Sequence, residues 1–410
     1  MASRREFIKA GIAGTALVFV PGLGLFRCTR TSVEPTIDPI NLNFVSPVNL
    51  PEEQGGFYIQ FFEGRDYRPD DLDLDTWQLR LTQTVNGAAI RETSLSFDDI
   101  ATRYPNEEAS FFQTFQCVGN SPGGFQLGNA YFTGVPLRHY LENDLGVDWS
   151  QANRVYFRCH DGYTTNHLKE RIMVDDPAPA YLVYKYNGIP FSDRRDGSLA
   201  HGYPVRMVVP DMLGMKSPKA ILEIEVSDRD EVEGYWESRP VRSAQPSITW
   251  ADIPPLAINS RIFRPVNYQK VSKGTTFRVT GVAVGGVDPV ARVEVGLVPV
   301  KNRNQPDGEI VWDDARVLDA PAMDARPAYD DSSGADFAEA LARLDAQPWP
   351  APFVWTLWEY DLAVPSGGGE YGLYARATDR AGRVQPLEEA TAEANADGNN
   401  AIHRLIIQAE

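Results

Sequence analysis

Residues 114–120, Thr-Phe-Gln-Cys-Val-Gly-Asn, are the most informative stretch of this 410-residue chain. The aromatic and β-branched run from Ala109 to Cys117 predicts a buried strand, and the Gly-Asn pair after it predicts a turn. A cysteine at such a strand end exposes its sulfur, and a thiolate there suits a nucleophile or a soft metal ligand. Taken alone, a cysteine after a β-prone strand is more often a small core residue.

Further sequence blocks follow this stretch in a fixed order. They are Gly-Asn-Ala-Tyr-Phe-Thr-Gly-Val-Pro-Leu at 128–137, His-Gly-Tyr-Pro-Val-Arg-Met-Val-Val-Pro at 201–210, Gly-Met-Lys-Ser-Pro-Lys at 214–219 and Gly-Tyr-Trp-Glu at 234–237. Together with the cysteine block they resemble the sulfite oxidase family of molybdopterin enzymes, over roughly residues 40–240. Five blocks in order are far more specific than any one of them.

The resemblance implies a molybdopterin cofactor with one molybdenum per chain and Cys117 as its only protein ligand. A soft thiolate suits that ligand set, and a single protein ligand leaves coordination positions open for oxygen transfer. The guanidinium of Arg206 fits the cofactor phosphate bidentately, and Lys219 with the backbone at Ser217 completes the cradle. The implied catalytic residue and metal ligand is Cys117, and the implied cofactor-binding residues are Tyr58, Cys117, Asp161, His201, Arg206, Ser217 and Lys219.

The residues alone leave plainer interpretations open. His201 and Arg206 are also typical of a surface hairpin, and Lys216 and Lys219 of solvated charges on one face. Three neighbours of Asp161 are either pocket residues or ordinary loop residues: His160, Tyr163 and His167.

Short strands and helices alternate over residues 40–245, a pattern typical of an α+β domain. Alternating residues before the Asn-Gly pair at 86–87 predict a hairpin. Ser96, which precedes two aspartates, predicts a helix start. We also expect a Thr-Gly turn at 133–134 and a helix over 135–145.

The composition changes to Pro, Ser and Arg around 240–255, which predicts a linker. Beyond it, strand-like segments separated by Gly, Pro and Asp predict a β-sandwich over 256–410. An acidic, alanine-rich insertion at about 301–350 interrupts the pattern and contains one expected helix, 337–344. The family resemblance implies an α+β molybdopterin-binding domain followed by an all-β immunoglobulin-like sandwich, which forms a homodimer.

Three positions depart from the pattern of sulfite oxidases, which surround the metal with arginines and a tyrosine. Ser46 and Pro122 stand where that pattern has arginine, and Val241 stands near its tyrosine. Sulfite is a small dianion, which a site without those cations holds poorly. The expected substrate is a small molecule, a sulfur compound whose identity as sulfite is doubtful. A sulfoxide-type reductase on the same scaffold and a metal-free exported binding protein are the alternatives.

The first 30 residues resemble a twin-arginine export signal, because Arg4-Arg5 precede an apolar stretch from Ala10 to Phe26. The expected location is periplasmic, with a membrane tether if the signal stays uncleaved. This pathway carries folded proteins, which suits a chain that acquires a cofactor in the cytoplasm.

The net charge of −17 argues against nucleic acid as a partner, although an acidic surface also serves solubility. The three cysteines form no cluster for iron–sulfur and no Cys-x-x-Cys-His for haem. We therefore expect a separate electron-transfer partner, a cytochrome or a membrane subunit. An oxidising compartment would permit one disulfide, with Cys117–Cys159 as the obvious pair.

Overall fold

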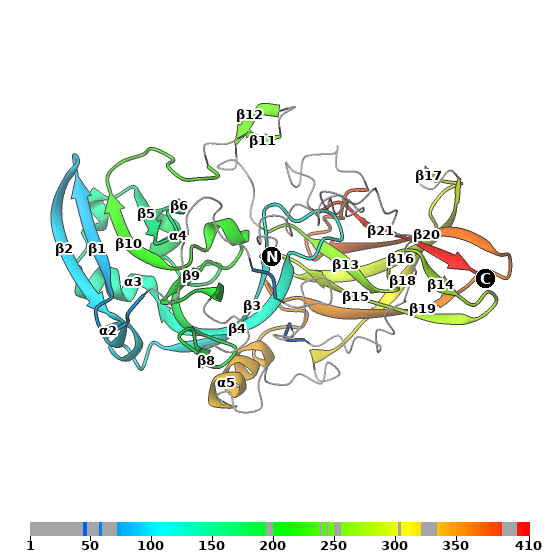
Figure 1. Cartoon of the computed structure of the whole chain (residues 1–410), viewed down its shortest axis with the longest axis horizontal. Helices are drawn as coiled ribbons and strands as arrows, with labels where there is room; N and C mark the ends of the chain where they lie inside the picture. The colour runs from blue at the N-terminus through cyan, green and yellow to red at the C-terminus, as the bar shows by residue number, and fades with distance from the viewer. Residues whose placement is uncertain are drawn as a thin grey trace, which may run out of the picture. The chain divides into compact units, whose positions relative to one another are not determined.

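The computed structural model describes residues 44–46, 57–59, 72–193, 200–237, 240–242, 245–249, 256–301, 305–320, 334–387 and 400–410. The predicted twin-arginine segment lies outside these residues. Among the described residues, no helix has both the length and the apolar character needed to cross a membrane. Asn41–Glu410 form one compact unit (Figure 1).

The first sheet of the α+β region has the strand order β2-β1-β10-β5-β6. Its strands are β1 (Gln78–Val85), β2 (Ala88–Ser96), β5 (Arg154–Cys159), β6 (Thr164–Leu168) and β10 (Ile221–Ser227). The predicted hairpin is confirmed between β1 and β2, where Asn86 and Gly87 have φ angles of 51° and 75°, as a tight hairpin turn requires. The predicted helix start is confirmed too. The Ser96 hydroxyl accepts a hydrogen bond from the Asp99 N–H and caps α2 (Phe97–Thr102).

The second sheet has the order β3-β4-β7-β8, with β9 beside β7. Its strands are β3 (Ala109–Gln116), β4 (Leu127–Pro136), β7 (Tyr181–Tyr186), β8 (Ile189–Pro190) and β9 (Arg206–Val208). The Thr-Gly pair at 133–134 lies inside β4, so the predicted turn is wrong. A side chain at Gly134 would overlap the carbonyl of Leu182 on β7, so this glycine permits close strand packing.

Short helices complete this region. They are α3 (Leu137–His139), the π-helix η3 (Tyr140–Asp144), the 3₁₀-helix η4 (Trp149–Gln151), α4 (Lys169–Met173) and the 3₁₀-turn η6 (Gly214–Lys216). The helix predicted over 135–145 therefore exists, but it begins at Leu137 because β4 continues to Pro136.

The C-terminal region is a β-sandwich whose strands follow the order β13-β15-β19-β18-β16-β20-β21-β14. The strands are β13 (Asn259–Arg264), β14 (Gln269–Val271), β15 (Thr276–Val284), β16 (Val290–Lys301), β17 (Gln305–Pro306), β18 (Trp312–Val317), β19 (Thr356–Ala363), β20 (Gly369–Asp379) and β21 (His403–Ala409). Residues from both halves of this path form one apolar core, including Val279, Val295, Trp358 and Leu373.

Two segments between the predicted elements are more regular than the sequence suggested. The predicted linker contains a small hairpin, β11 (Pro240–Arg242) and β12 (Gln245–Thr249). Within the predicted insertion, β18 pairs with both β16 and β19 and so belongs to the sandwich. The helix predicted there is confirmed as α5 (Gly334–Asp345), which packs against β3 of the α+β region.

A second apolar core is shared by the two regions. Phe112 and Tyr131 of the second sheet belong to the same buried cluster as Phe337, Val282 and Trp355 of the C-terminal region. Strand β3 therefore contacts its own sheet and the C-terminal region at once, and this strand leads to Cys117.

Candidate active site

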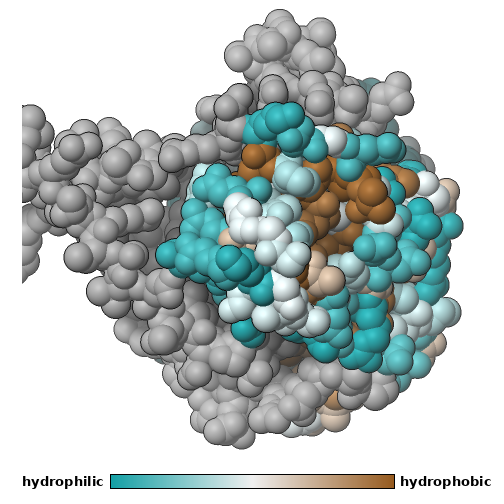
Figure 2. Space-filling model, turned by 90° about the vertical axis from the view of Figure 1, so that its right-hand side faces the viewer, coloured by the Kyte–Doolittle hydropathy of each residue, from teal (hydrophilic) through white to brown (hydrophobic). Residues whose placement is uncertain are grey.

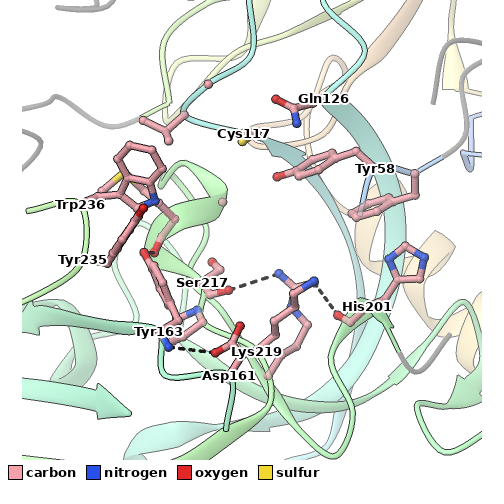
Figure 3. A pocket seen from close by; sticks show the side chains of 17 residues that line it. Tyr58, Cys117, Gln126, Asp161, Tyr163, His201, Ser217, Lys219, Tyr235 and Trp236 are labelled. Carbon is pink, nitrogen blue, oxygen red and sulfur yellow. Dashed lines mark hydrogen bonds between the residues drawn. The ribbon is translucent and has the colours of Figure 1, made fainter. Parts of the chain in front are cut away.

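One cavity of about 320 Å³ lies where several turns of the α+β region meet (Figure 3). All seven residues singled out in the sequence line it: Tyr58, Cys117, Asp161, His201, Arg206, Ser217 and Lys219. Tyr163, which the sequence left open, lines it as well. Several other lining residues had no role predicted from the sequence: Phe57, Val118, Gln126, Met215, Tyr235 and Trp236.

Cys117 is the first residue after β3 and is partly exposed to the cavity. Its N–H donates to the Gln126 carbonyl at 3.0 Å, and its own carbonyl accepts from the Asn120 N–H at 3.1 Å. The Asn120 side-chain oxygen accepts from the Gln126 N–H at 2.9 Å. The loop that carries the thiol is thus closed on itself by three hydrogen bonds.

The cysteine pairing considered from the sequence is wrong, because Cys117 and Cys159 are both free thiols. Cys159 is buried at the end of β5, where burial raises the pKa of its thiol well above its usual value. It is an unreactive core thiol, whereas Cys117 faces the cavity.

Arg206, at the start of β9, is a buried cation. Its guanidinium donates to the carbonyls of His201 at 2.7 Å, Ser217 at 3.3 Å and Met207 at 3.3 Å. It also lies 4.5 Å from the centre of the Phe115 ring, close enough for a cation–π contact. Burial lowers the pKa of Arg206 to about 10, so the group keeps its charge at neutral pH.

Lys219 is the second cation of the cavity and donates to the Ala200 carbonyl at 2.7 Å. Burial and then the charge of Arg206 lower its pKa to about 7, while the carboxylate of Asp161 acts in the opposite direction. The two cations thus disfavour each other's charged state. A bound anion would relieve that repulsion.

His201 lies beside these cations as an uncharged ring. Its imidazole stacks on Tyr186, with ring centres 4.4 Å apart, and meets Phe57 edge to face at 5.3 Å. Burial lowers the pKa of His201 well below its usual value, and the charges of Lys219 and Arg206 lower it further. We refer to Arg206, Lys219 and His201 as the cationic end of the cavity.

Three aromatic residues form another side of the cavity (Figure 3). The rings of Tyr163 and Tyr235 lie 6.2 Å apart, and those of Tyr235 and Trp236 lie 5.1 Å apart and nearly perpendicular. The Tyr163 hydroxyl donates to the Met215 carbonyl at 2.6 Å, which ties this side to the η6 turn. We call Tyr163, Tyr235 and Trp236 the aromatic wall.

A partly buried ion pair involves the residue that follows the aromatic wall in the sequence. Lys216 donates to the Glu237 carboxylate at 2.8 Å and to the Asn166 carbonyl at 2.6 Å. Glu237 is 1% exposed and follows Trp236 directly, so this pair links η6 to the end of the wall. Lys216 is therefore neither a solvated charge nor a lining residue, unlike Lys219.

The two histidines near Asp161 make structural contacts and do not line the cavity. His160 accepts from the Trp77 indole N–H at 3.0 Å. His167 lies 2.7 Å from the Lys216 carbonyl, and burial lowers the pKa of its ring well below the usual value. Asp161 itself is buried, and its carboxylate accepts from the Tyr163 N–H at 2.9 Å.

The donors around the cavity fit a molybdopterin cofactor. Cys117 presents a thiol to the cavity and would serve as the protein ligand of the metal. The described residues contain no group of three or more His, Cys, Asp or Glu side chains arranged for a metal. Arg206 and Lys219 supply the charge that a phosphate group needs. Gly214 keeps space for Tyr58, which lines the cavity, because a side chain there would overlap the Tyr58 hydroxyl.

Ser217 differs from the expectation in one detail. Its N–H already donates to the Gly214 carbonyl at 3.1 Å within the η6 turn. Its hydroxyl accepts from the Val209 N–H at 3.0 Å and retains its own proton as a donor. The side chain of Ser217 is therefore better placed to donate to an anion than its backbone is.

Two of the positions that depart from the sulfite oxidase pattern, Ser46 and Pro122, do not line this cavity. Ser46 is fully buried, and its backbone N–H and hydroxyl pair with the backbone of Asn129 on β4. Pro122 lies in the loop after Cys117, and Val241 lies in β11, where its side chain is outside the described residues. Among the described lining residues, Arg206 and Lys219 are the cations.

Comparison with known proteins gives two family matches along the chain. Residues 67–236 match the oxidoreductase molybdopterin binding domain, and residues 251–410 match the Mo-co oxidoreductase dimerisation domain. Human mitochondrial sulfite oxidase is 25% identical over 383 residues, which cover 87% of this chain and 60% of the relative. The NADPH nitrate reductase of Emericella nidulans is 26% identical over 415 residues, which cover 89% of this chain and 44% of the relative.

A solved structure shares the fold over most of the chain. The sulfane dehydrogenase SoxCD of Paracoccus pantotrophus superposes with a TM-score of 0.60 at 19% identity, covering 91% of this chain and 85% of that one. At this identity the likeness concerns the fold alone. The chain spans about 60% of the length of the sulfite oxidase relatives it matches.

Proposed function

Because the chain belongs to the sulfite oxidase family of molybdopterin-dependent oxidoreductases, we propose that it transfers oxygen atoms or electrons at one molybdenum bound by Cys117. The observation that carries this proposal is the meeting of one accessible thiol, the buried cation Arg206 and the partly buried cation Lys219 around a single cavity. The cofactor of this family, Mo-molybdopterin, supplies the redox chemistry when bound.

The residues of the chain would bind and orient this cofactor. Cys117 would bind the metal as a thiolate, and Arg206, Lys219 and the Ser217 hydroxyl would bind the phosphate. His201 is uncharged, so its ring nitrogens can hydrogen-bond the pterin without adding to the positive charge. Tyr58 and Asp161 would contact the pterin from the other lining segments. The aromatic wall would limit the water that reaches a bound substrate.

Elemental analysis of the purified protein tests the proposal most directly. Expressed where molybdopterin is made, the wild type should contain close to one molybdenum per chain. Cys117→Ser should lose both the metal and turnover while keeping the fold, as judged by circular dichroism. Cys159→Ala is the matched control, because its buried thiol does not line the cavity, and it should keep its molybdenum. A folded wild-type protein without molybdenum would favour the exported binding protein instead.

We propose a small uncharged sulfur compound rather than sulfite as the substrate. Arg206 and Lys219 would both bind the phosphate in this arrangement, and Tyr163, Tyr235 and Trp236 line the same cavity as Cys117 with aromatic side chains. A sulfoxide-type reductase is therefore the second candidate function. Turnover of sulfite and of methionine sulfoxide, each measured with dye electron carriers, distinguishes a sulfite-oxidising enzyme from a sulfoxide-type reductase. Sulfite as much the better substrate would overturn this preference.

We propose further that the protein is exported by the twin-arginine pathway and acts in the periplasm with a cytochrome or a membrane subunit as its electron partner. The Arg4-Arg5 sequence supports the export, and fractionation of cells expressing Arg4→Lys/Arg5→Lys tests it. Full turnover of the purified enzyme with oxygen as the only added acceptor would contradict the proposed partner.

A homodimer through the C-terminal region is the proposed assembly. The match to a dimerisation domain over residues 251–410 supports it. Apolar residues also gather into one area on the face seen in Figure 2, bordered by polar ones, and such areas commonly mark interaction sites. Light scattering of the purified protein should give twice the mass of the chain.

A further inference from the structure

A chain of buried amides connects the C-terminal region with the end of β3. Gln116, the last residue of β3, is 1% exposed, and its Oε1 accepts from Asn259 Nδ2 at 2.9 Å. Asn259, the first residue of β13, is 2% exposed, and its Oδ1 accepts from Gln385 Nε2 at 3.1 Å. The residue directly before Cys117 is thus bonded to the sandwich.

Backbone groups determine the orientation of each amide in this hydrogen-bonded series. Gln385 Oε1 accepts from the Ala377 N–H at 2.8 Å and from the Ser260 hydroxyl at 2.6 Å. A backbone N–H can only donate, so Gln385 has to present its oxygen there and its Nε2 to Asn259. Asn259 then has to present its oxygen to Gln385 and its Nδ2 to Gln116. The direction of the bond that reaches β3 is fixed by the sandwich.

A second set of hydrogen bonds joins β3 to the C-terminal region at Thr114, two residues before Gln116. The Thr114 N–H donates to the Phe353 carbonyl at 2.8 Å, and the Thr114 hydroxyl oxygen accepts from the Trp355 N–H at 2.8 Å. The same hydroxyl donates to Asn129 Oδ1 on β4 at 2.9 Å. Both Thr114 and Asn129 are fully buried, so water cannot replace these bonds easily.

The alternation of side chains along a strand links these contacts to the thiol. Successive side chains point to opposite faces, so Thr114 and Gln116 share the face toward the C-terminal region. Cys117 comes next and lines the cavity. A displacement of Gln116 therefore passes to the Cys117 sulfur through a single peptide unit. In enzymes, a displacement of about 1 Å can lower the rate about 100-fold.

We propose that Asn259 is a positioning residue for Cys117, and that the sandwich sets the location of the metal-binding thiolate through the Asn259–Gln116 bond. This inference rests on the proposed function, in which Cys117 is the molybdenum ligand. It gives the C-terminal region a part in the active site through a residue that does not line the cavity.

The test compares two substitutions in the holoenzyme that each alter a polar contact between the regions. Asn259→Leu removes the amide contacts on Gln116 and Gln385 at similar side-chain volume. Asp336→Asn removes the ion pair of α5 with Lys185, 3.2 Å long, which joins the same regions away from the strand end. We expect Asn259→Leu to lower kcat/KM at least about tenfold and to change the sulfur shell in the molybdenum X-ray absorption spectrum. Asp336→Asn should leave both unchanged.

A second readout does not depend on the metal. In cofactor-free protein, the rate of Cys117 alkylation by iodoacetamide against pH reports the surroundings of the thiol. We expect Asn259→Leu to shift this profile and Asp336→Asn to leave it in place. Gln116→Met removes the same bond from the other side and serves if Asn259→Leu does not fold.

The outcomes separate this inference from the proposed function. If Asn259→Leu folds, binds molybdenum and keeps its kcat/KM, absorption spectrum and alkylation profile, Asn259 has no positioning role. If the wild type binds no molybdenum, the proposed function fails, and the alkylation profile still decides whether the sandwich positions Cys117.

Discussion

The cationic end and the aromatic wall of the cavity are stabilised in opposite ways. Arg206 is surrounded by backbone carbonyls and an aromatic face, and burial lowers the pKa of both Arg206 and Lys219. Tyr235 and Trp236 are partly exposed and contact each other through their rings. The cationic end can bind a negatively charged group, whereas the aromatic wall acts through its shape. Changes at the first should therefore affect cofactor retention, and changes at the second should affect the choice of substrate.

Removing the charge of Arg206 should have the largest effect of the predictions that test this contrast. Hydrogen bonds from a charged group contribute about 1.5–3 kcal/mol each, so Arg206→Leu should weaken cofactor retention roughly 10- to 100-fold. Molybdenum per chain after extended dialysis measures this. Arg206→Lys should fall in between, because lysine keeps the charge without the planar fork. Full molybdenum retention in Arg206→Leu would show that the cationic end does not hold the phosphate.

The pH dependence of anion binding should show an effect of intermediate size. In the cofactor-free protein Lys219 has a pKa of about 7, and a bound anion favours its charged form. Above that pH, binding has to take up a proton, so the affinity for inorganic phosphate should fall up to about tenfold per pH unit. Calorimetric titration between pH 7.5 and 9.5 measures the slope. Lys219→Met should bind weakly and without this slope, and a wild-type affinity that is flat across the range would contradict the assignment.

The free energy of unfolding of the cofactor-free protein should also depend on the protonation of Lys219. The pKa of Lys219 in the folded protein lies below its ordinary value of 10.5, so between about pH 7 and 10 the unfolded chain binds more protons. Stability from this group therefore rises with pH across that window and is lowest below pH 7. Chemical denaturation of wild type and Lys219→Met at pH 7 and pH 9 should show the gain in the wild type alone.

Opening the aromatic wall should have the smallest effect and a different signature. Trp236→Ala removes a large partly exposed ring next to the buried Glu237. We expect KM to change several-fold, with a relative gain for bulkier sulfoxides, and molybdenum content to stay at the wild-type level. Steady-state kinetics on a series of sulfoxides of increasing size gives the answer. A loss of molybdenum in this variant would mean that the two ends are not independent.

Local rules explain what the sequence predicted well. The hairpin at Asn86 and Gly87 and the cap at Ser96 depend on residues adjacent in the chain, so they could be identified without tertiary information. The strand that ends before Cys117 follows from its aromatic and β-branched composition. Five of the seven site residues lie in the ordered family blocks, whereas Tyr58 and Asp161 came from separate matches to the family. The structure places all seven around one cavity.

Tertiary contacts explain what the sequence did not reveal. Gly134 is typical of a turn in the local sequence, but a glycine is needed there because β7 packs close to it, and no local pattern encodes that contact. Lys216 and Lys219 are three residues apart, yet the η6 turn directs one to Glu237 and the other into the cavity. Gln126 and Met215 carry no sequence signal for a pocket, because their place follows from how distant loops meet.

The apolar core that the two regions share has a consequence for dissecting the protein. A fragment that ends at the linker, near residue 245, would keep every predicted cofactor contact and lose Trp355, Phe337 and Val282 from that core. It would expose the side of β3 against which α5 packs, so the fragment should be aggregation-prone even with an intact cavity. The intact chain should instead unfold in a single calorimetric transition that includes both regions. The two regions should therefore not be exchangeable as independent modules.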